Sequence, residues 1–252
     1  MGADPYVYPG TSVLRNLLNI RDAQELARVE YELTWARRQE LHTSPVRGHF
    51  DLPHLQEIHR RLFQDLFAWA GQLRTVIISK GTSTFFQSPD FSTAAEYTFG
   101  FLKESRMLRP DSMSDEEFVE GAAEFLSRLN YLHPFREGNG RAQRAFVDQV
   151  AALGGRVMSW RNIGEMDNTR ASIEAFNDGS GRAFEPLLRR VIAPPLDGLS
   201  PFDNPIYRVH GPLAASAESM PPSGSKAGQC GALTVRGGAC RRCGRCPYHG
   251  CV

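Results

Sequence analysis

The sequence predicts a mainly helical domain that carries one small β-hairpin and is followed by a non-globular segment. Apolar residues recur at helical spacing through most of residues 1–193, and only the run 75–86 combines β-branched residues with a turn. From Ala193 onward, Pro, Gly and Ser replace this periodic pattern. We therefore expect a folded domain in residues 1–193, a flexible linker in 194–229 and a cysteine-rich tail in 230–252.

The composition allows one sizeable core and gives no sign of a membrane or of a general nucleic-acid partner. The chain has 252 residues, of which 41% are hydrophobic, and its 29 basic residues nearly balance 28 acidic ones. No apolar run reaches the roughly 18 residues that a membrane-spanning helix needs. The N-terminus also lacks the basic-then-apolar order of a signal peptide, so we expect a cytoplasmic protein. The first 229 residues contain no cysteine, which excludes a disulfide framework for the main domain.

Helices are expected over residues 23–41, 52–67, 114–132, 142–153, 167–177 and 182–192. Asp22 is placed to cap the first of them, and Ser114 with Glu117 forms a capping box at the start of the third. His54 and His59 are five residues apart in the second helix and do not share a face well, so we assign them surface or packing roles.

The run from His133 to Arg144, HPFREGNGRAQR, places chemistry-bearing residues between the end of one helix and the start of the next. Its glycines let backbone N–H groups approach an anion, and the following helix adds its N-terminal N–H groups and the positive end of its dipole. Arg141 and Arg144 are three residues apart, so they share a helix face and both can bind phosphate oxygens. Glu137 is a hard oxygen ligand suited to Mg²⁺. His133 can accept a proton near neutral pH.

Each of these residues alone has an ordinary structural explanation. A histidine at a helix end, a Gly-x-Gly turn and two arginines on a solvated helix face are all common in proteins without an active site there. Their concentration in one short segment is what favours an anion-binding active site.

The run also matches HPFx(D/E)GNGRxxR, the motif of Fic proteins, at every specified position, and the chain is identified on it as a member of that family. The resemblance covers about residues 5–193 and includes the segments 8–16 and 67–74. It implies the Fic fold, which is a mainly α helical bundle with a small β-hairpin flap. It also implies a protein adenylyltransferase (AMPylase), an enzyme that moves AMP from ATP to a Ser, Thr or Tyr hydroxyl of a target protein.

The resemblance further implies a role for each residue of the loop. His133 would be the general base, Glu137 would hold Mg²⁺ on the phosphates of ATP, and Phe135 would point into the core. The phosphate-binding residues would be Gly138, Asn139 and Gly140 of an anion hole, Arg141 on the β-phosphate and Arg144 on the γ-phosphate. Related Doc kinases carry lysine where Gly140 stands, so this chain resembles the members that transfer a nucleotidyl group.

The predicted hairpin corresponds to the flap of Fic proteins. Its strands are expected at 75–79 and 84–86, joined by a turn over 80–83. The resemblance implies that the flap binds the target protein by adding the target's backbone as a further strand. The expected target-binding residues are Ile77, Ile78, Ser79, Lys80, Gly81 and Thr82. An ordinary surface hairpin is the alternative.

The inhibitory motif of many Fic proteins, (S/T)xxxE(G/N), is not intact in this chain. Glutamate precedes glycine only at Glu120 and Glu137, and the residues four positions earlier are Glu116 and His133. The resemblance therefore implies a toxin that is inhibited by a separate small antitoxin, whose inhibitory helix would bring a glutamate to Arg144. The implied targets are the ATPase subunits of DNA gyrase and topoisomerase IV.

Other functions stay open at this point. The chain could be a translocated effector that modifies host proteins, or it could transfer another nucleotide or phosphocholine through the same loop. It could also be a non-catalytic Fic scaffold that binds partners through its flap and its tail.

The tail contains a possible zinc site. Cys230, Cys240, Cys246 and His249 form a Cys₃His set of the kind that binds tetrahedral Zn²⁺, and Cys243 or Cys251 could replace one of them. The tail is basic from Lys226 onward, so a folded zinc module could contact nucleic acid. A flexible basic tail with free thiols is the alternative.

Overall fold

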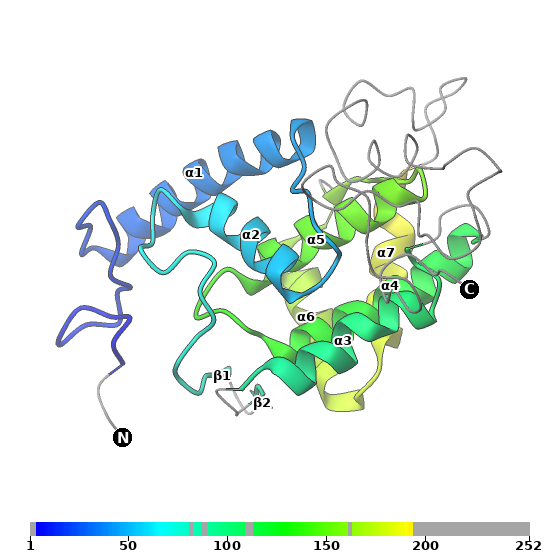
Figure 1. The fold of residues 1–252 in the computed structure, drawn as a ribbon. Coiled ribbons are helices and arrows are strands. Elements are labelled where there is room, and N and C mark those ends of the chain that lie inside the picture. The colour runs from blue at the N-terminus through cyan, green and yellow to red at the C-terminus, as the bar shows by residue number, and fades with distance from the viewer. Residues whose placement is uncertain (1–3, 81–82, 87–89, 109–112, 161–162, 194–252) are drawn as a thin grey trace, which may run out of the picture.

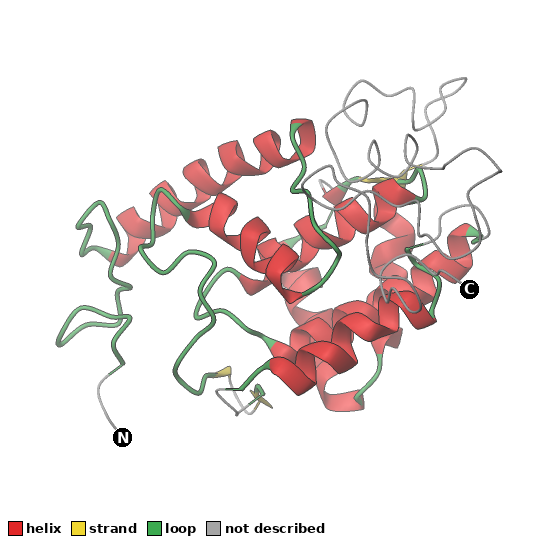
Figure 2. Cartoon of the chain, viewed as in Figure 1, coloured by secondary structure: helices red, strands yellow, loops and turns green. Residues whose placement is uncertain are grey.

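The fold of the chain is mainly helical, as the sequence predicts (Figures 1 and 2). The structure is a computed structural model, and it describes residues 4–80, 83–86, 90–108, 113–160 and 163–193. The predicted linker 194–229 and tail 230–252 lie outside the described residues. Among the helices of the described part, none combines the length and the apolar character needed to cross a membrane.

The helix α4 is the centre of the packing. It spans Asp115–Leu132, and the other helices are α1 (Ala23–Thr43), α2 (Leu52–Phe63), α3 (Ser92–Glu104), α5 (Asn139–Leu153), α6 (Glu165–Asp178), the 3₁₀ turn η3 (Gly181–Phe184) and α7 (Glu185–Val191). α4 contacts α3, α5, α6, α7 and η3, while α2 packs between α1 and α5 (Figure 1). The loop between α4 and α5 therefore begins at the helix that contacts most of the other helices.

The sequence of α4 explains why it holds this position. Ser114 and Glu117 form the predicted capping box, in which the Ser114 side chain accepts the Glu117 N–H and the Glu117 carboxylate accepts the Ser114 N–H. The predicted apolar face is completely buried: Phe118, Ala122, Phe125, Leu129 and Leu132. Each large side chain of that face contributes roughly 1.5–3 kcal/mol by its burial. On another face, Gly181 of η3 lies so close to the backbone of α4 that a Cβ there would be 2.3 Å from Ala123 C, which only glycine permits.

Several predicted element bounds are wrong by a few residues. α2 ends at Phe63 and not at residue 67, because the N–H groups of Leu66 and Phe67 both bond the Phe63 carbonyl and close a turn. α5 starts at Asn139 and not at 142, because Gly138 takes the positive φ that opens the helix. The segment 182–192 divides into η3 and α7. α3 was not predicted, although Ala95, Phe99 and Leu102 have helical spacing.

The predicted hairpin is present but much shorter than expected. Its strands are β1 (Ser79–Lys80) and β2 (Ser83–Thr84), which pair antiparallel, whereas residues 75–78 form no strand. The reason is that the Val76 and Phe86 carbonyls accept hydrogen bonds from the buried Arg74 side chain, at 2.7 and 2.5 Å, and not from a facing strand. A second small pair, β3 (Val157–Met158) with β4 (Ile192–Ala193), was not predicted.

Candidate active site

The loop 133–138 brings the predicted site residues together between α4 and α5. His133 is the C-cap of α4, and Glu137 and Gly138 directly precede α5. The first two turns of α5 carry Asn139, Gly140, Arg141 and Arg144. One loop and one helix start therefore hold an imidazole, a carboxylate, two glycines and three guanidinium groups, of which that of Arg136 pairs with Asp4.

The backbone of His133 is held in a conformation that non-glycine residues avoid. Its φ of 43° and ψ of 61° are left-handed, which costs of the order of 1 kcal/mol or more for a side chain with a Cβ. The His133 N–H donates to the Leu129 carbonyl at 2.9 Å, and the His133 carbonyl accepts the Arg74 Nε–H at 2.8 Å. Neighbouring structure thus fixes the backbone on both sides of the histidine.

The imidazole of His133 is also fixed in orientation and tautomer. Nδ1 lies 3.2 Å from the Asn130 carbonyl oxygen, which can only accept, so Nδ1 is the donor. In the neutral ring Nε2 then carries the lone pair, as a general base requires. The Phe85 ring stacks on the imidazole with centroids 3.8 Å apart and an angle of 18°, and Phe176 of α6 meets Phe85 edge-on. Sequence reasoning placed Phe85 in the hairpin but did not connect it with His133.

Arg74 joins the loop to the base of the flap. Only 4% of the residue is exposed, and the side chain donates to the carbonyls of His133, Val76 and Phe86. The Arg74 N–H bonds the Pro134 carbonyl as well, at 2.9 Å. Burial among these neutral acceptors lowers the pKa of the guanidinium. In the sequence, Arg74 stands out only as the end of the segment 67–74, because no sequence pattern shows that an arginine is buried.

Asn139 and Phe135 hold the middle of the loop. The Asn139 Oδ1 accepts the Phe135 N–H at 3.0 Å and its Nδ2 donates to the Phe135 carbonyl at 2.8 Å. Both side-chain functions of Asn139 are therefore used within the loop, so it can face an anion only with its backbone N–H. Phe135 is fully buried, which confirms that it points into the core.

His59 of α2 supports the loop from below. Its Nε2 lies 2.9 Å from the Glu137 carbonyl and its Nδ1 accepts the Gly71 N–H at 2.8 Å, so the ring is the neutral Nε2–H tautomer. The ring stacks on Phe135 at 3.9 Å and on Phe63 at 4.6 Å. Burial lowers the pKa of His59 to about 4. Of the two roles predicted for His59, the packing role is confirmed and the surface role is wrong, because the residue is fully buried.

The N-terminus of α5 is arranged to receive an anion. Carboxylate or hydroxyl side chains cap α1, α2 and α4, whereas no side chain among the described residues caps α5, and the same is true of α3, α6 and α7. Gly138, at a φ of 80°, starts the helix against the Phe63 ring, where a Cβ would be 2.2 Å from Cζ. The uncapped N–H groups and the helix dipole are typical of a phosphate site.

The two arginines of α5 both lie over aromatic rings. Arg141 lies 4.8 Å from the Phe63 centroid and Arg144 lies 5.9 Å from the Trp160 centroid. The Trp160 Nε1–H donates to Asp148 at 2.5 Å, and Asp148 also pairs with Arg38 of α1 at 3.3 Å. Burial raises the pKa of the Asp148 carboxyl. The Trp160 ring that Arg144 covers is thus linked to α1 through Asp148 and Arg38.

Glu137 is the carboxylate that fits the expected Mg²⁺. Its side chain is 47% exposed, and its Oε1 accepts the Gly138 N–H at 2.9 Å and lies 3.7 Å from Arg141 Nη2. Within the described residues, no three or more Asp, Glu, His and Cys side chains gather as a metal cage. A single accessible carboxylate beside the N-terminus of a helix is compatible with Mg²⁺, which usually binds through one or two carboxylates and substrate phosphates.

The remaining predicted residues are only partly described. Ile77, Ile78 and Ser79 lead into the hairpin, and Ile77 is 60% exposed. Lys80 ends β1, while Gly81 and Thr82 lie outside the described residues. The candidate zinc ligands Cys230, Cys240, Cys246 and His249 also lie outside them, so the zinc site stays a prediction.

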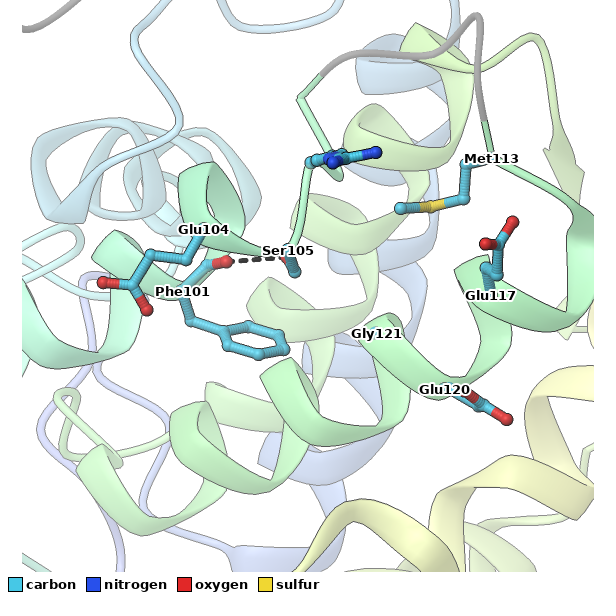
Figure 3. Close-up of a pocket in the computed structure, with 8 residues that line it drawn as sticks. Phe101, Glu104, Ser105, Met113, Glu117, Glu120 and Gly121 are labelled. Atoms are coloured by element: carbon cyan, nitrogen blue, oxygen red, sulfur yellow. Dashed lines mark hydrogen bonds between the residues drawn. The ribbon is translucent and has the colours of Figure 1, made fainter.

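A separate hollow of about 430 Å³ lies at the other end of α4 (Figure 3). The end of α3 and the start of α4 line it, with Glu104, Glu117 and Glu120 among its residues. Glu117 is already engaged in the capping box of α4. The hollow is acidic and lies far from the loop 133–138, so it does not compete with that loop as a site for a nucleotide phosphate.

Comparison with known proteins agrees with this site. The pattern of the Fic/DOC family matches residues 49–151, which include the whole loop. The chain is 44% identical over 163 residues to the probable protein adenylyltransferase Fic of Salmonella typhimurium, and the match covers 64% of this chain and 79% of that protein. The chain therefore belongs to the Fic/DOC family.

Two further relatives are close in sequence or in structure. The protein adenylyltransferase VbhT of Bartonella schoenbuchensis is 38% identical over 187 residues, which are 74% of this chain but only 38% of that longer protein. The crystal structure of BepC, a VirB-translocated effector protein of Bartonella tribocorum with bound AMPPNP, matches with a TM-score of 0.70 and 26% identity. That match covers 75% of this chain and 96% of BepC.

The close contact at Gly138 predicts a difference between two glycine variants. Gly138→Ala should lower the free energy of unfolding by about 2–3 kcal/mol, because its Cβ would overlap Phe63 and its φ is left-handed. Gly140→Ala is the matched control: the nearest neighbour of its Cβ would be Arg144 Nη1 at 3.5 Å, and alanine is favoured over glycine inside a helix, so the free energy of unfolding should stay unchanged or rise by up to about 1 kcal/mol. Urea denaturation measures both. Equal midpoints for the two variants would show that the Phe63 contact is not tight.

The buried neutral His59 predicts a loss of stability at mildly acidic pH. The unfolded chain takes up the proton near pH 6.5, and the folded chain takes it up only near its lowered pKa of about 4. The stability due to His59 is therefore complete above pH 6.5 and falls by roughly 2–3 kcal/mol as the pH drops toward 4.

The test compares the wild type with His59→Gln, whose amide N–H can still donate to the Glu137 carbonyl. The variant should be less stable at pH 7.5, but its free energy of unfolding should change less between pH 7.5 and 5. An identical pH slope for the two proteins would contradict the account of His59.

Proposed function

We propose that this chain is a protein adenylyltransferase that moves AMP from ATP to a hydroxyl group of a target protein. One observation carries the proposal: a fixed imidazole with its Nε2 lone pair and the uncapped start of α5, with two arginines, lie at the two ends of one short loop. This is the combination of a proton acceptor and a phosphate site that nucleotidyl transfer requires.

In the proposed reaction, His133 Nε2 accepts the proton of the target hydroxyl. The hydroxyl oxygen forms a bond to the α-phosphorus of ATP, the bond from that phosphorus to the oxygen bridging to the β-phosphate breaks, and pyrophosphate leaves. The products are an AMP ester of the target, pyrophosphate and a proton, which His133 can return to solvent. General-base assistance of this kind contributes about 10²- to 10⁴-fold to a rate.

The rest of the site positions the triphosphate. The N–H groups at the start of α5 would receive phosphate oxygens, with Arg141 on the β-phosphate and Arg144 on the γ-phosphate. Glu137 would hold Mg²⁺, which when bound neutralises phosphate charge and orients the leaving pyrophosphate. Gly140 stands where the related Doc kinases carry a lysine, and this difference supports transfer of a nucleotidyl group over transfer of a phosphoryl group. The AMPPNP in the similar BepC structure supports ATP as the donor.

The hairpin beside His133 is proposed to hold the target. Phe86 N–H bonds the Tyr131 carbonyl of α4 at 3.1 Å, and Phe85 lies on the imidazole, so the flap is anchored next to the base. A target strand that pairs with residues 77–82 would bring its hydroxyl to that side of the loop.

The biological setting is the finer part of the proposal. We favour a cytoplasmic toxin that acts on DNA gyrase or topoisomerase IV and is inhibited by a small antitoxin whose glutamate reaches Arg144. The absence of an intact inhibitory motif in the sequence supports it. The second candidate is a translocated effector acting on host proteins, which the structural similarity to Bartonella effectors favours.

Replacement of the proposed base tests the reaction. With labelled ATP and Mg²⁺, His133→Ala should transfer at least about 10²-fold less label to protein than the wild type, while its affinity for ATP stays within about twofold. His49→Ala, at an exposed histidine outside the loop, is the control and should keep wild-type activity. Equal labelling by the wild type and His133→Ala would remove His133 from the mechanism.

The missing inhibitory motif predicts activity without an activator. The purified chain alone should label proteins in a bacterial lysate, and the labelled bands should include the ATPase subunits of gyrase or topoisomerase IV. Labelling only in a host-cell lysate would favour the effector, and no labelling in either lysate would contradict an unguarded enzyme.

A further inference from the structure

A carboxylate from outside the family-matched segment reaches the phosphate-binding arginine. Glu30 lies on α1, whereas the Fic/DOC match begins at residue 49. Its carboxylate accepts a hydrogen bond from Arg141 Nη2, and only 13% of the Glu30 side chain is exposed. A buried charge costs free energy unless it has a partner, so Glu30 is well placed only because Arg141 faces it.

Thr34, one helical turn further along α1, faces the same guanidinium. Its hydroxyl donates to the Glu30 carbonyl at 2.6 Å, so its oxygen is left to accept, and Arg141 Nη1 lies 3.5 Å away. Thr34 is 5% exposed on a helix whose buried face otherwise contains Leu26 and Leu41. The apolar periodicity of residues 23–41 predicts an apolar face for this helix. The polar residues on that face are explained by Arg141.

These contacts surround the guanidinium of Arg141. Phe63 lies below it at 4.8 Å, Glu30 and Thr34 approach it from α1, and Glu137 approaches from the loop with Oε1 3.7 Å from Nη2. An arginine side chain loses considerable rotamer freedom when it binds a ligand. Because contacts with α1 already restrict the Arg141 side chain, it loses less rotamer freedom on binding phosphate than an unrestrained arginine would.

We propose that Glu30 is a positioning residue for the nucleotide, which holds Arg141 ready for the β-phosphate. The proposal rests on the proposed function, because it assigns the β-phosphate to Arg141. Glu30 itself touches no reacting atom and acts through Arg141. The opposite arrangement, in which Glu30 occupies the place of the phosphate and weakens nucleotide binding, is an outcome of the test.

A series of nucleotides distinguishes positioning from a merely structural role. Glu30→Ala should weaken ADP and ATP binding by about three- to tenfold, because Arg141 must then be ordered on binding. AMP has no β-phosphate, so its affinity should stay within about twofold of the wild type. Glu30→Gln keeps an acceptor oxygen and should recover much of the ADP affinity. Titration calorimetry with AMP, ADP and ATP measures all three.

Controls separate the possible failures. Glu32→Ala on the same helix removes a carboxylate that pairs with the exposed Arg28, and it should leave all three affinities unchanged. If Glu30→Ala misfolds, Glu30→Gln carries the test, with ADP weakened about twofold and AMP unchanged.

Wild-type ADP affinity in both Glu30 variants, or tighter ADP binding by Glu30→Ala, would overturn the positioning role and leave the proposed function intact. A uniform loss for AMP and ADP in Glu30→Gln would also overturn it. A wild-type chain that binds ADP no more tightly than AMP would overturn this proposal and the proposed phosphate site together.

Discussion

The arrangement of the site depends on the buried guanidinium of Arg74. It donates to carbonyls on both sides of the flap and to the carbonyl of His133, so one side chain fixes the flap and the loop to each other. Its partners are neutral carbonyls, for which the planar, many-donor shape of arginine is suited and the single ammonium of lysine is not. The strained backbone of His133 persists because this side chain and the end of α4 hold it.

The other supports of the loop also come from outside the motif. His59 is hydrogen-bonded to the Glu137 carbonyl, Phe85 stacks on the imidazole of His133, and Glu30 of α1 pairs with Arg141. His59 and Phe85 contact a backbone carbonyl and a ring face, Glu30 contacts the Arg141 guanidinium, and none of them caps the start of α5. The loop is thus rigid where protons and phosphates must be placed, and open where an anion would bind. That division agrees with catalysis by positioning and charge neutralisation.

The sequence predicted every long helix except α3, together with the capping box and the loop between α4 and α5, because these depend on local patterns. The resemblance to the Fic motif implied that Phe135 points into the core, and its burial confirms this. It could not predict Arg74, His59 or Glu30 as supports, because each acts across 59, 78 or 111 residues of chain. The hairpin was expected too long because β-branched residues 75–78 favour a strand locally, whereas the side chain of the preceding Arg74 takes the Val76 carbonyl. The burial of Arg74, which directs its guanidinium there, cannot be seen in the sequence.

The most direct test of the account is the origin of the transferred group. The wild-type chain would be given ATP labelled either at the α-phosphate or at the γ-phosphate, together with a protein target, and the label on the target would be counted. The account predicts label from the α-phosphate alone, with a mass increase of the modified peptide equal to one adenylyl group, which is AMP less one water. Label from the γ-phosphate would show phosphoryl transfer and would contradict the assignment of this site to adenylyl transfer.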